Sequence, residues 1–287
     1  MNVTLPEEKA IKKRQIILYI IILIVCIICV MVAFYIQFYA RIDLANLVGM
    51  GQETKLGKKT DEEKQTLKSE FNQLFTNEIE NDDGSNDDKK IDSSQKLVYT
   101  KYQKKESKLN SYDLEVNIPE INIKNDTIDK YNQEIEEIFL KMANLVLQSQ
   151  NNNAVYTVDY VANIKDDILS VMVKSNLKEG SKAQKAIIQT YNYDLRNNKE
   201  LTLADMLKIE RVDSDKVQEQ INTEIATEQK KADDLKSLGY NMYSRNTSSD
   251  IYKIDKTTEF YWSGNALYII YAYGNETATT EMDIVIL

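Results

Sequence analysis

Residues 155–195 decide the fold, and they read VYTVDYVANIKDDILSVMVKSNLKEGSKAQKAIIQTYNYDL. Three segments rich in β-branched and aromatic residues predict strands, at 155–163, 168–177 and 186–195. Polar turns at 165–167 and 179–181 separate these segments. Because connections this short join antiparallel neighbours, the stretch predicts an antiparallel sheet.

Further strands and helices are predicted on both sides of this stretch. Apolar patterns indicate strands at 97–103, 111–119, 258–262, 267–273 and 282–287. Capping residues and apolar stripes indicate helices that begin at Asp126 or Thr127, at Thr202 and at Asp213. Pro119 is expected to end the second strand, because proline cannot donate to a strand ladder. Together these elements predict an α+β domain over 98–287, with helices packed on an antiparallel sheet.

A segment of different character lies near the N-terminus. Residues 16–36, IILYIIILIVCIICVMVAFYI, contain no charged residue, glycine or proline. A bilayer core of about 30 Å needs about 20 helical residues, so the sequence predicts a transmembrane signal anchor over 16–39. Lysine and arginine gather before this span, which predicts a cytoplasmic tail over 1–15 and an extracytoplasmic location for the rest of the chain. No small-residue cleavage site follows the span, so we expect it to stay uncleaved.

Residues 40–97 are expected to connect the span to the domain. Thr60 and Glu63 match a capping box, and apolar residues on one face predict a helix over 60–80. Two interpretations stay open for this helix: a stalk that docks on the domain or self-associates, and a surface for a partner. The following NDDGSNDDKKIDSSQK, residues 81–96, is too polar to bury a core and predicts a flexible acidic linker.

The composition excludes several kinds of catalytic site. The 287 residues include no histidine, which excludes Ser-His-Asp and Cys-His catalysis and histidine-ligated metal sites within this chain. The two cysteines, Cys26 and Cys29, both lie in the predicted span. The outer domain therefore has no disulfide, which favours a Gram-positive bacterial source over a eukaryotic secreted one. No phosphate-binding loop or G-x-S-x-G motif is present. We therefore predict no catalytic, cofactor-binding or metal-ligating residues, and a protein that is not an enzyme.

The charge of the chain points to one class of partner. The formal net charge is −9, and residues 98–287 carry 23 Lys and Arg against 30 Asp and Glu. Nucleic-acid binding needs a basic patch, so this acidic domain argues against a nucleic-acid partner. It favours a basic partner instead, although solubility alone is the competing reason for such a charge.

Tyrosine is also abundant, with 18 copies. Tyr191 and Tyr193 share one strand face, as do Tyr271 and Tyr273. Aromatic rings on an exposed sheet face stack on glycan rings or anchor a protein partner, so these four tyrosines are the candidate partner-binding residues. The competing interpretation is that the rings pack beneath the helices.

Three stretches together resemble one family. They are IPEINIKNDTIDKYNQEI (118–135), TYNYDLRNNKELTLADML (190–207) and EFYWSGNALYIIYAYGNETATTEMDIVIL (259–287). They resemble the extracytoplasmic domain of lysozyme-sensing anti-sigma factors (RsiV-like), which is shared with the non-catalytic N-terminal region of certain peptidoglycan deacetylases (PdaC-like). The resemblance implies a non-enzymatic binding or sensing domain, with lysozyme or another basic wall-active protein as candidate partner. It does not carry over a sigma-binding domain, for which residues 1–15 leave no room, or a deacetylase domain.

The sequence thus predicts a membrane-anchored protein of a bacterial cell envelope. Two alternatives stay open. An accessory of a cell-wall glycan enzyme predicts a cleft with two converging carboxylates above a tyrosine floor. A structural envelope protein predicts self-association through the helix over 60–80. The oligomeric state is left open.

Overall fold

The computed structural model of the chain describes residues 56–57, 59–75, 96–149, 153–273 and 281–287, all within one compact unit that spans Thr54–Leu287. The predicted cytoplasmic tail and signal anchor, and most of the connector and linker, lie outside these residues. In the part that is described, no helix combines the length and apolar character needed to span a bilayer.

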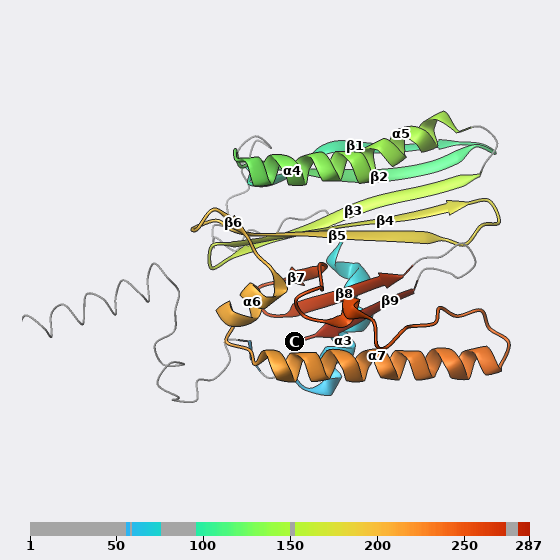
Figure 1. Ribbon diagram of the computed structural model, residues 1–287. Coiled ribbons are helices and arrows are strands. Elements are labelled where there is room, and N and C mark those ends of the chain that lie inside the picture. Colours follow the sequence, from blue (N-terminus) through green and yellow to red (C-terminus); the bar gives the residue numbers. More distant parts are fainter. Residues whose placement is uncertain (1–55, 58, 76–95, 150–152, 274–280) are drawn as a thin grey trace, which may run out of the picture. The chain divides into compact units, whose positions relative to one another are not determined.

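Nine strands of the described residues form two sheets (Figure 1). The large sheet has the order β1-β2-β3-β4-β5-β6, with β1 (Val98–Lys108), β2 (Tyr112–Ile121), β3 (Ala154–Lys165), β4 (Ile168–Glu179), β5 (Lys185–Asp194) and β6 (Lys199–Glu200). The small sheet has the order β7-β8-β9, with β7 (Phe260–Trp262), β8 (Leu267–Tyr273) and β9 (Glu281–Ile286). The predicted α+β class is confirmed, with two sheets where the sequence predicts one.

The three strands predicted from residues 155–195 are antiparallel neighbours. β3 pairs with β4 up to Lys165 and Ile168, and Asp166 and Asp167 form the turn between them with φ angles of 53° and 62°. A two-residue turn with positive φ matches the twist of paired strands, and aspartate enters this backbone region more readily than most residues. β4 pairs antiparallel with β5 in turn.

β2 and β3 are parallel, which corrects the wholly antiparallel sheet that we predict from sequence. Tyr112 pairs with Ala154, and Val116 pairs with Val158. Between the two strands the chain runs through α4 (Asp126–Ile135), the π-helical turn η3 (Glu136–Leu140) and α5 (Lys141–Gln148). A helical crossover of this length returns the next strand in the same direction, so the short-turn argument holds only for β3, β4 and β5.

β2 also continues to Ile121, past the point where Pro119 is expected to end it. Pro119 pairs with Thr100, beside a register shift between Thr100 and Tyr102 in β1. On the other side of β2, β3 pairs only as far as Val116. The missing N–H of proline therefore removes no ladder bond toward β3, and the strand continues.

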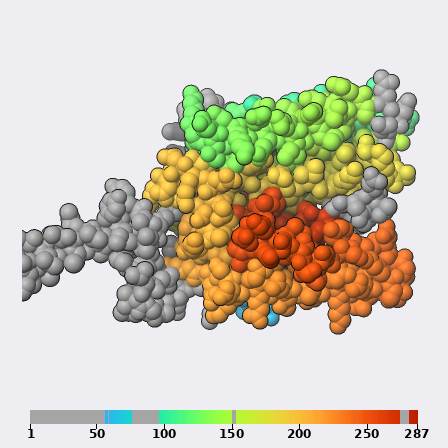
Figure 2. All heavy atoms as spheres, in the orientation of Figure 1, coloured from blue at the N-terminus to red at the C-terminus, as the bar shows by residue number. Residues whose placement is uncertain are grey.

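The layers stack in the order helix, large sheet, small sheet, helix (Figure 1). The helix from α4 to α5 packs on one face of the large sheet, and Phe139 and Val158 belong to the core between them. The opposite face of the large sheet packs on the small sheet, through residues such as Met172 and Tyr268. Figure 2 shows the outer helices on opposite sides of the molecule, residues 126–148 in green and α7 in orange.

The other face of the small sheet is covered by α6 (Leu203–Ile209) and α7 (Ser214–Ser237), and Ile221 and Ile225 share one buried core with Ile269 and Val285. Both faces of the small sheet are therefore buried, which explains why β8 is almost continuously apolar. The segment 240–257 follows α7 and includes only the short helix η4 (Asp250–Tyr252).

The helical segment α3 (Asp61–Ser69) and η1 (Phe71–Leu74) is part of the folded unit. The predicted capping box at Thr60 begins α3. Phe71 is buried, with its ring centroid 6.0 Å from that of Tyr268, and Lys68 forms a 2.8 Å ion pair with Glu224 of α7. Of the interpretations left open for this helix, docking on the domain is the one that these contacts support.

Candidate functional site

The four candidate partner-binding tyrosines are buried, which corrects their placement on an exposed sheet face. Tyr191 and Tyr193 expose 3% and 1% of their surface, and Tyr271 and Tyr273 each expose 6%. Their rings belong to the cores beneath the helical layers, because each of these strand faces is covered by such a layer. The competing interpretation, packing beneath the helices, describes all four rings.

Tyr271 and Tyr273 fasten the segment 240–257 onto the small sheet. The hydroxyls of Tyr273 and Tyr252 share a hydrogen bond of 2.8 Å, and those of Tyr271 and Thr257 share one of 3.0 Å. Tyr243 stacks on Tyr273 with a centroid separation of 4.5 Å. These two candidates therefore bind another part of the same chain.

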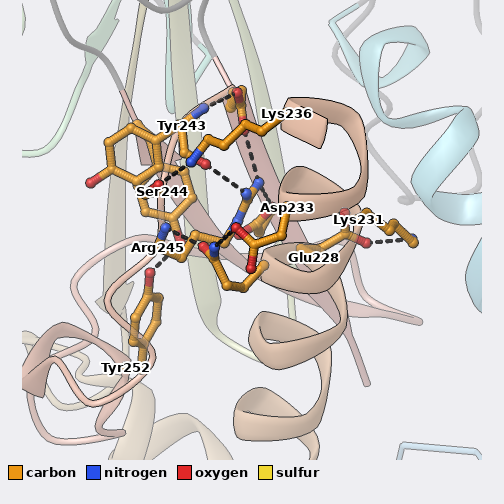
Figure 3. A network of polar contacts seen from close by, with 12 residues as sticks. Glu228, Lys231, Asp233, Lys236, Tyr243, Ser244, Arg245 and Tyr252 are labelled. Atoms are coloured by element: carbon orange, nitrogen blue, oxygen red, sulfur yellow. Dashed lines mark hydrogen bonds and ion pairs between the residues drawn. The ribbon is translucent and has the colours of Figure 1, made fainter. Parts of the chain in front are cut away.

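Arg245 is the centre of this attachment (Figure 3). Its buried guanidinium donates to the Asp283 carboxylate through Nε at 2.6 Å and through Nη2 at 2.8 Å, and Nη2 also donates to Glu281 at 3.1 Å. Its backbone N–H donates to Gln229 of α7 at 2.5 Å. The segment is thus held between β9 and α7, and Arg245 has its charge matched inside the molecule.

Tyr193 supports the beginning of α4. Asn125 caps this helix, because its side-chain oxygen accepts from the N–H of Ile128 at 2.9 Å. The side-chain amide of Asn125 donates to the Tyr193 hydroxyl at 3.1 Å. Tyr193 therefore links β5 to the helix above it.

The hydroxyl of Tyr191, unlike that of Tyr193, has no hydrogen-bond partner among the described residues. The ring of Tyr191 packs on that of Tyr131 in α4, with centroids 4.9 Å apart and planes at 50°. The Tyr191 hydroxyl oxygen is buried. A buried polar group without a hydrogen-bond partner lowers the folding stability by about 1–3 kcal/mol.

Three glutamates raise the pKa values of Tyr131 and Tyr191 through their negative charge, and we call Glu134, Glu200 and Glu259 the acidic edge cluster. They come from three elements: α4, β6 and the residue preceding β7. Figure 1 shows α4, β6 and β7 at one end of the large sheet. The fold therefore gathers at one sheet edge three carboxylates that are far apart in sequence.

Local hydrogen bonds position Glu259 and Glu200. Glu259 accepts from the backbone N–H of Thr190 at 2.6 Å, at the edge of β5 that β6 does not reach. Glu200 lies opposite Tyr193 in the short β5–β6 pairing. The intervening turn is shaped by Asp194, whose carboxylate accepts from the backbone N–H groups of residues 196 and 197 at 3.0 and 2.9 Å.

The electrostatics of the cluster are those of concentrated negative charge. Burial raises the pKa of the Tyr131 hydroxyl, and the negative charge of Glu200 raises this pKa further, while the hydroxyl donates to the backbone carbonyl oxygen of Asn192 at 3.5 Å. Burial also raises the pKa of Tyr191, with contributions from Glu134 and Glu259. Each tyrosine is therefore kept neutral beside the carboxylates.

The pKa of the Glu259 carboxyl is also raised. Burial is the largest influence and raises the pKa of this carboxyl, Glu134 raises it further, and hydrogen bonds from Thr190 and Thr258 oppose the rise. For the whole cluster, one ion pair is found within the described chain: Lys130 with Glu134 at 3.8 Å, both partly exposed. The negative charge is therefore largely uncompensated.

This arrangement can accept a cation. Ionised carboxylates accept hydrogen bonds and do not donate them, so they attract positively charged donors. In the described part of the chain, no group of three or more acidic or cysteine side chains is arranged to hold a metal ion.

Two cavities lined by described residues lie away from this cluster. One is at the tip of the β1–β2 hairpin and includes Asp113, and the other lies beside α5 and includes Glu179. Each contains a single carboxylate, so neither has the pair of converging acids that a glycosidase-type site needs.

Sequence reasoning missed Glu134, Glu200 and Glu259. Acidic residues in turns and on helix faces are usually solvated, so the sequence predicts no carboxylate site at these positions. The signal that pointed toward the cluster was the tyrosine-rich strand that contains Tyr191. No local pattern links the three glutamates, because only the tertiary fold brings their elements together.

No protein-family model and no curated protein matches the chain. Among solved structures, the chain is similar to a DUF3298 family protein of Pseudomonas aeruginosa PAO1, with 15% sequence identity and a TM-score of 0.36, over 62% of this chain and 82% of that one. It is also similar to a DUF3298 family member from Bacteroides fragilis NCTC 9343, with 12% identity and a TM-score of 0.33, over 60% of this chain and 81% of that one. The structural neighbours are thus DUF3298 family proteins, and the finer RsiV-like and PdaC-like resemblance stays a prediction.

Proposed function

We propose that this protein is a single-span protein of a bacterial cell membrane whose extracytoplasmic domain binds or senses a basic protein and has no enzymatic activity. In this proposal the N-terminus is cytoplasmic and residues 98–287 are outside. Lysozyme or another basic wall-active protein is the candidate partner, as the RsiV-like and PdaC-like resemblance implies.

The observation that supports this proposal is the acidic edge cluster. Glu134, Glu200 and Glu259 have one peripheral counter-charge among the described residues, Lys130. Lysine and arginine side chains of a basic protein would supply the missing positive charge and donate hydrogen bonds to these carboxylates.

The test is binding of the full chain, in nanodiscs of neutral phosphatidylcholine, to hen lysozyme at low and physiological salt. We expect saturable binding that weakens as salt rises, because screening acts on charge pairs at an interface rim. Retention at neither salt would exclude lysozyme as partner.

A pair of variants tests the site itself. Glu134→Gln with Glu200→Gln removes two negative charges from the cluster. Glu219→Gln with Asp234→Asn removes two from the exposed face of α7 and serves as the matched control. Partly exposed ion pairs contribute about 0.2–1 kcal/mol each, so the cluster variant should raise Kd roughly 2- to 30-fold. Equal weakening by both variants would mean that net charge, and not the cluster, determines binding.

A further inference from the structure

An apolar cavity lies at the opposite end of β5 from the acidic edge cluster. It has a volume of about 480 Å³ and forms where the C-terminal part of α5 meets the ends of β3, β4 and β5. Its apolar walls include Met142, Leu145, Val146, Tyr156, Leu177 and Ile187. The volume falls within the range of roughly 300–1,000 Å³ that is typical of small-molecule sites.

Two wall residues are unusually exposed for aliphatic side chains. Leu145 exposes 53% of its surface and Ile187 exposes 41%. One comes from α5 and the other from β5, so the two side chains flank the opening from the helix layer and from the sheet. The apolar lining therefore reaches the surface and is open to a ligand from solvent.

Two polar groups of the cavity lack a hydrogen-bond or ion-pair partner among the described residues. The Ser149 side-chain oxygen is buried and has no hydrogen-bond partner among the described residues. Lys185 lines the same cavity, is exposed, and forms no ion pair within the described chain. Tyr156, in contrast, donates to the carbonyl oxygen of Phe139 at 3.3 Å.

The one carboxylate of the cavity is already neutralised. Glu179 pairs with Lys182 at 3.2 Å, and Lys182 does not line the cavity. The charge left at the mouth is therefore the positive charge of Lys185. An apolar interior with an unpaired cation at its mouth is complementary to an apolar chain that ends in an anion.

From this geometry we infer that the α5 cavity binds a single-chain amphiphile with an anionic head, of the fatty-acid type. The alkyl chain lies among the aliphatic walls, the carboxylate pairs with the Lys185 ammonium, and the Ser149 hydroxyl is a further donor for the head group. This site is independent of the proposed function, since it uses none of the residues of the acidic edge cluster.

The test is photolabelling of the full chain in phosphatidylcholine nanodiscs. The probe is decanoate with a diazirine on its chain, and the matched probe is the corresponding decylammonium. Labelled peptides are identified by mass spectrometry, and label in the predicted span 16–39 serves as the reference for non-specific partition. We expect saturable decanoate labelling of peptides that contain residues 142–149 and 185–187, roughly three- to tenfold above that by decylammonium.

Three variants decide the interpretation. Leu145→Glu places a negative charge at the opening and should abolish decanoate labelling of the cavity peptides. Lys185→Glu should lower it roughly three- to tenfold and reverse the preference between the two probes. The control, Leu238→Glu, alters a leucine that is 73% exposed just beyond α7 and should leave the labelling unchanged.

Four results would overturn the inference. They are cavity labelling no stronger than that of the rest of the domain, equal labelling by both probes, labelling that survives Leu145→Glu, and an equal loss in Leu238→Glu. Leu145, Lys185 and Leu238 are all exposed, so their variants are expected to fold. Circular dichroism of each variant checks this and distinguishes loss of the binding site from loss of the fold.

Discussion

Replacing Arg245 by methionine removes a buried cation while leaving its anionic partners in place. The side chains of Arg245 and Asp283 are 5% and 4% exposed, and Glu281 is 10% exposed. Removing one partner of a buried ion pair leaves an uncompensated buried charge, which costs about 3–5 kcal/mol. Domains of this kind have an unfolding free energy of about 5–15 kcal/mol, so Arg245→Met should remove a large part of the stability.

The assay is urea unfolding of the full chain in nanodiscs. It is followed by the fluorescence of Trp262, the single tryptophan of the sequence, which is buried in β7 of the small sheet. The control is Lys105→Met, which breaks an exposed pair with Glu115 and should cost no more than about 1 kcal/mol.

A double variant tests the cause of the loss. Arg245→Met with Asp283→Asn removes one of the two stranded charges, so it should be more stable than Arg245→Met alone. The reasoning would be refuted if Arg245→Met cost less than about 1 kcal/mol, or if adding Asp283→Asn lowered the stability further.

Three further variants test other parts of the structure. Phe71→Ala should lower the unfolding free energy by about 3–5 kcal/mol, because Phe71 is 2% exposed; a change below about 1 kcal/mol would show that α3 and η1 lie outside the cooperative unit. Tyr191→Phe removes a buried hydroxyl without a partner and should be neutral or stabilising by about 1 kcal/mol in the same assay, whereas a clear loss would reveal a hydrogen bond. Glu259 has a pKa above its ordinary 4.5, so its carboxyl binds a proton more tightly in the native state than in the unfolded state. The unfolding free energy should therefore fall as pH rises from about 4.5 through the raised pKa. In Glu259→Gln, this part of the pH dependence should disappear from unfolding curves measured between about pH 4 and 8.

Local signals predicted the strands and helices well, and the connections between distant elements poorly. Thr60, Thr202 and Asp213 cap helices as predicted, because capping acts within one turn, and Asn125 caps α4 one residue before the predicted Asp126 or Thr127. The β3–β4–β5 sheet follows from turns of a few residues. The prediction that Pro119 ends β2 is wrong, because whether a proline ends a strand depends on how far the neighbouring strand extends.

The four tyrosines show a second limit of sequence reasoning. Alternation along a strand establishes that Tyr191 and Tyr193 share a face, and it does not establish whether that face meets water or a helix. The helix that covers them begins far earlier in the chain, at Asp126. Only the crossover that makes β2 and β3 parallel places this helix on that face, and the same placement brings Glu134 beside Tyr191.

The irregular segment after α7 has a specific role that its polar sequence does not reveal. Arg245 is held by β9, and Tyr252 and Thr257 are held by hydroxyls of β8. Immediately beyond these attachments, Glu259 accepts from the backbone of Thr190 at the edge of the large sheet. The segment is therefore held on the small sheet by the side chains of Arg245, Tyr252 and Thr257, and it leads directly into Glu259. Beside Glu259, the backbone of Phe260 donates to the Thr190 hydroxyl at 3.1 Å and accepts from Asn192 at 2.8 Å, so hydrogen bonds to β5 hold Glu259 in the acidic edge cluster without the Arg245 attachment.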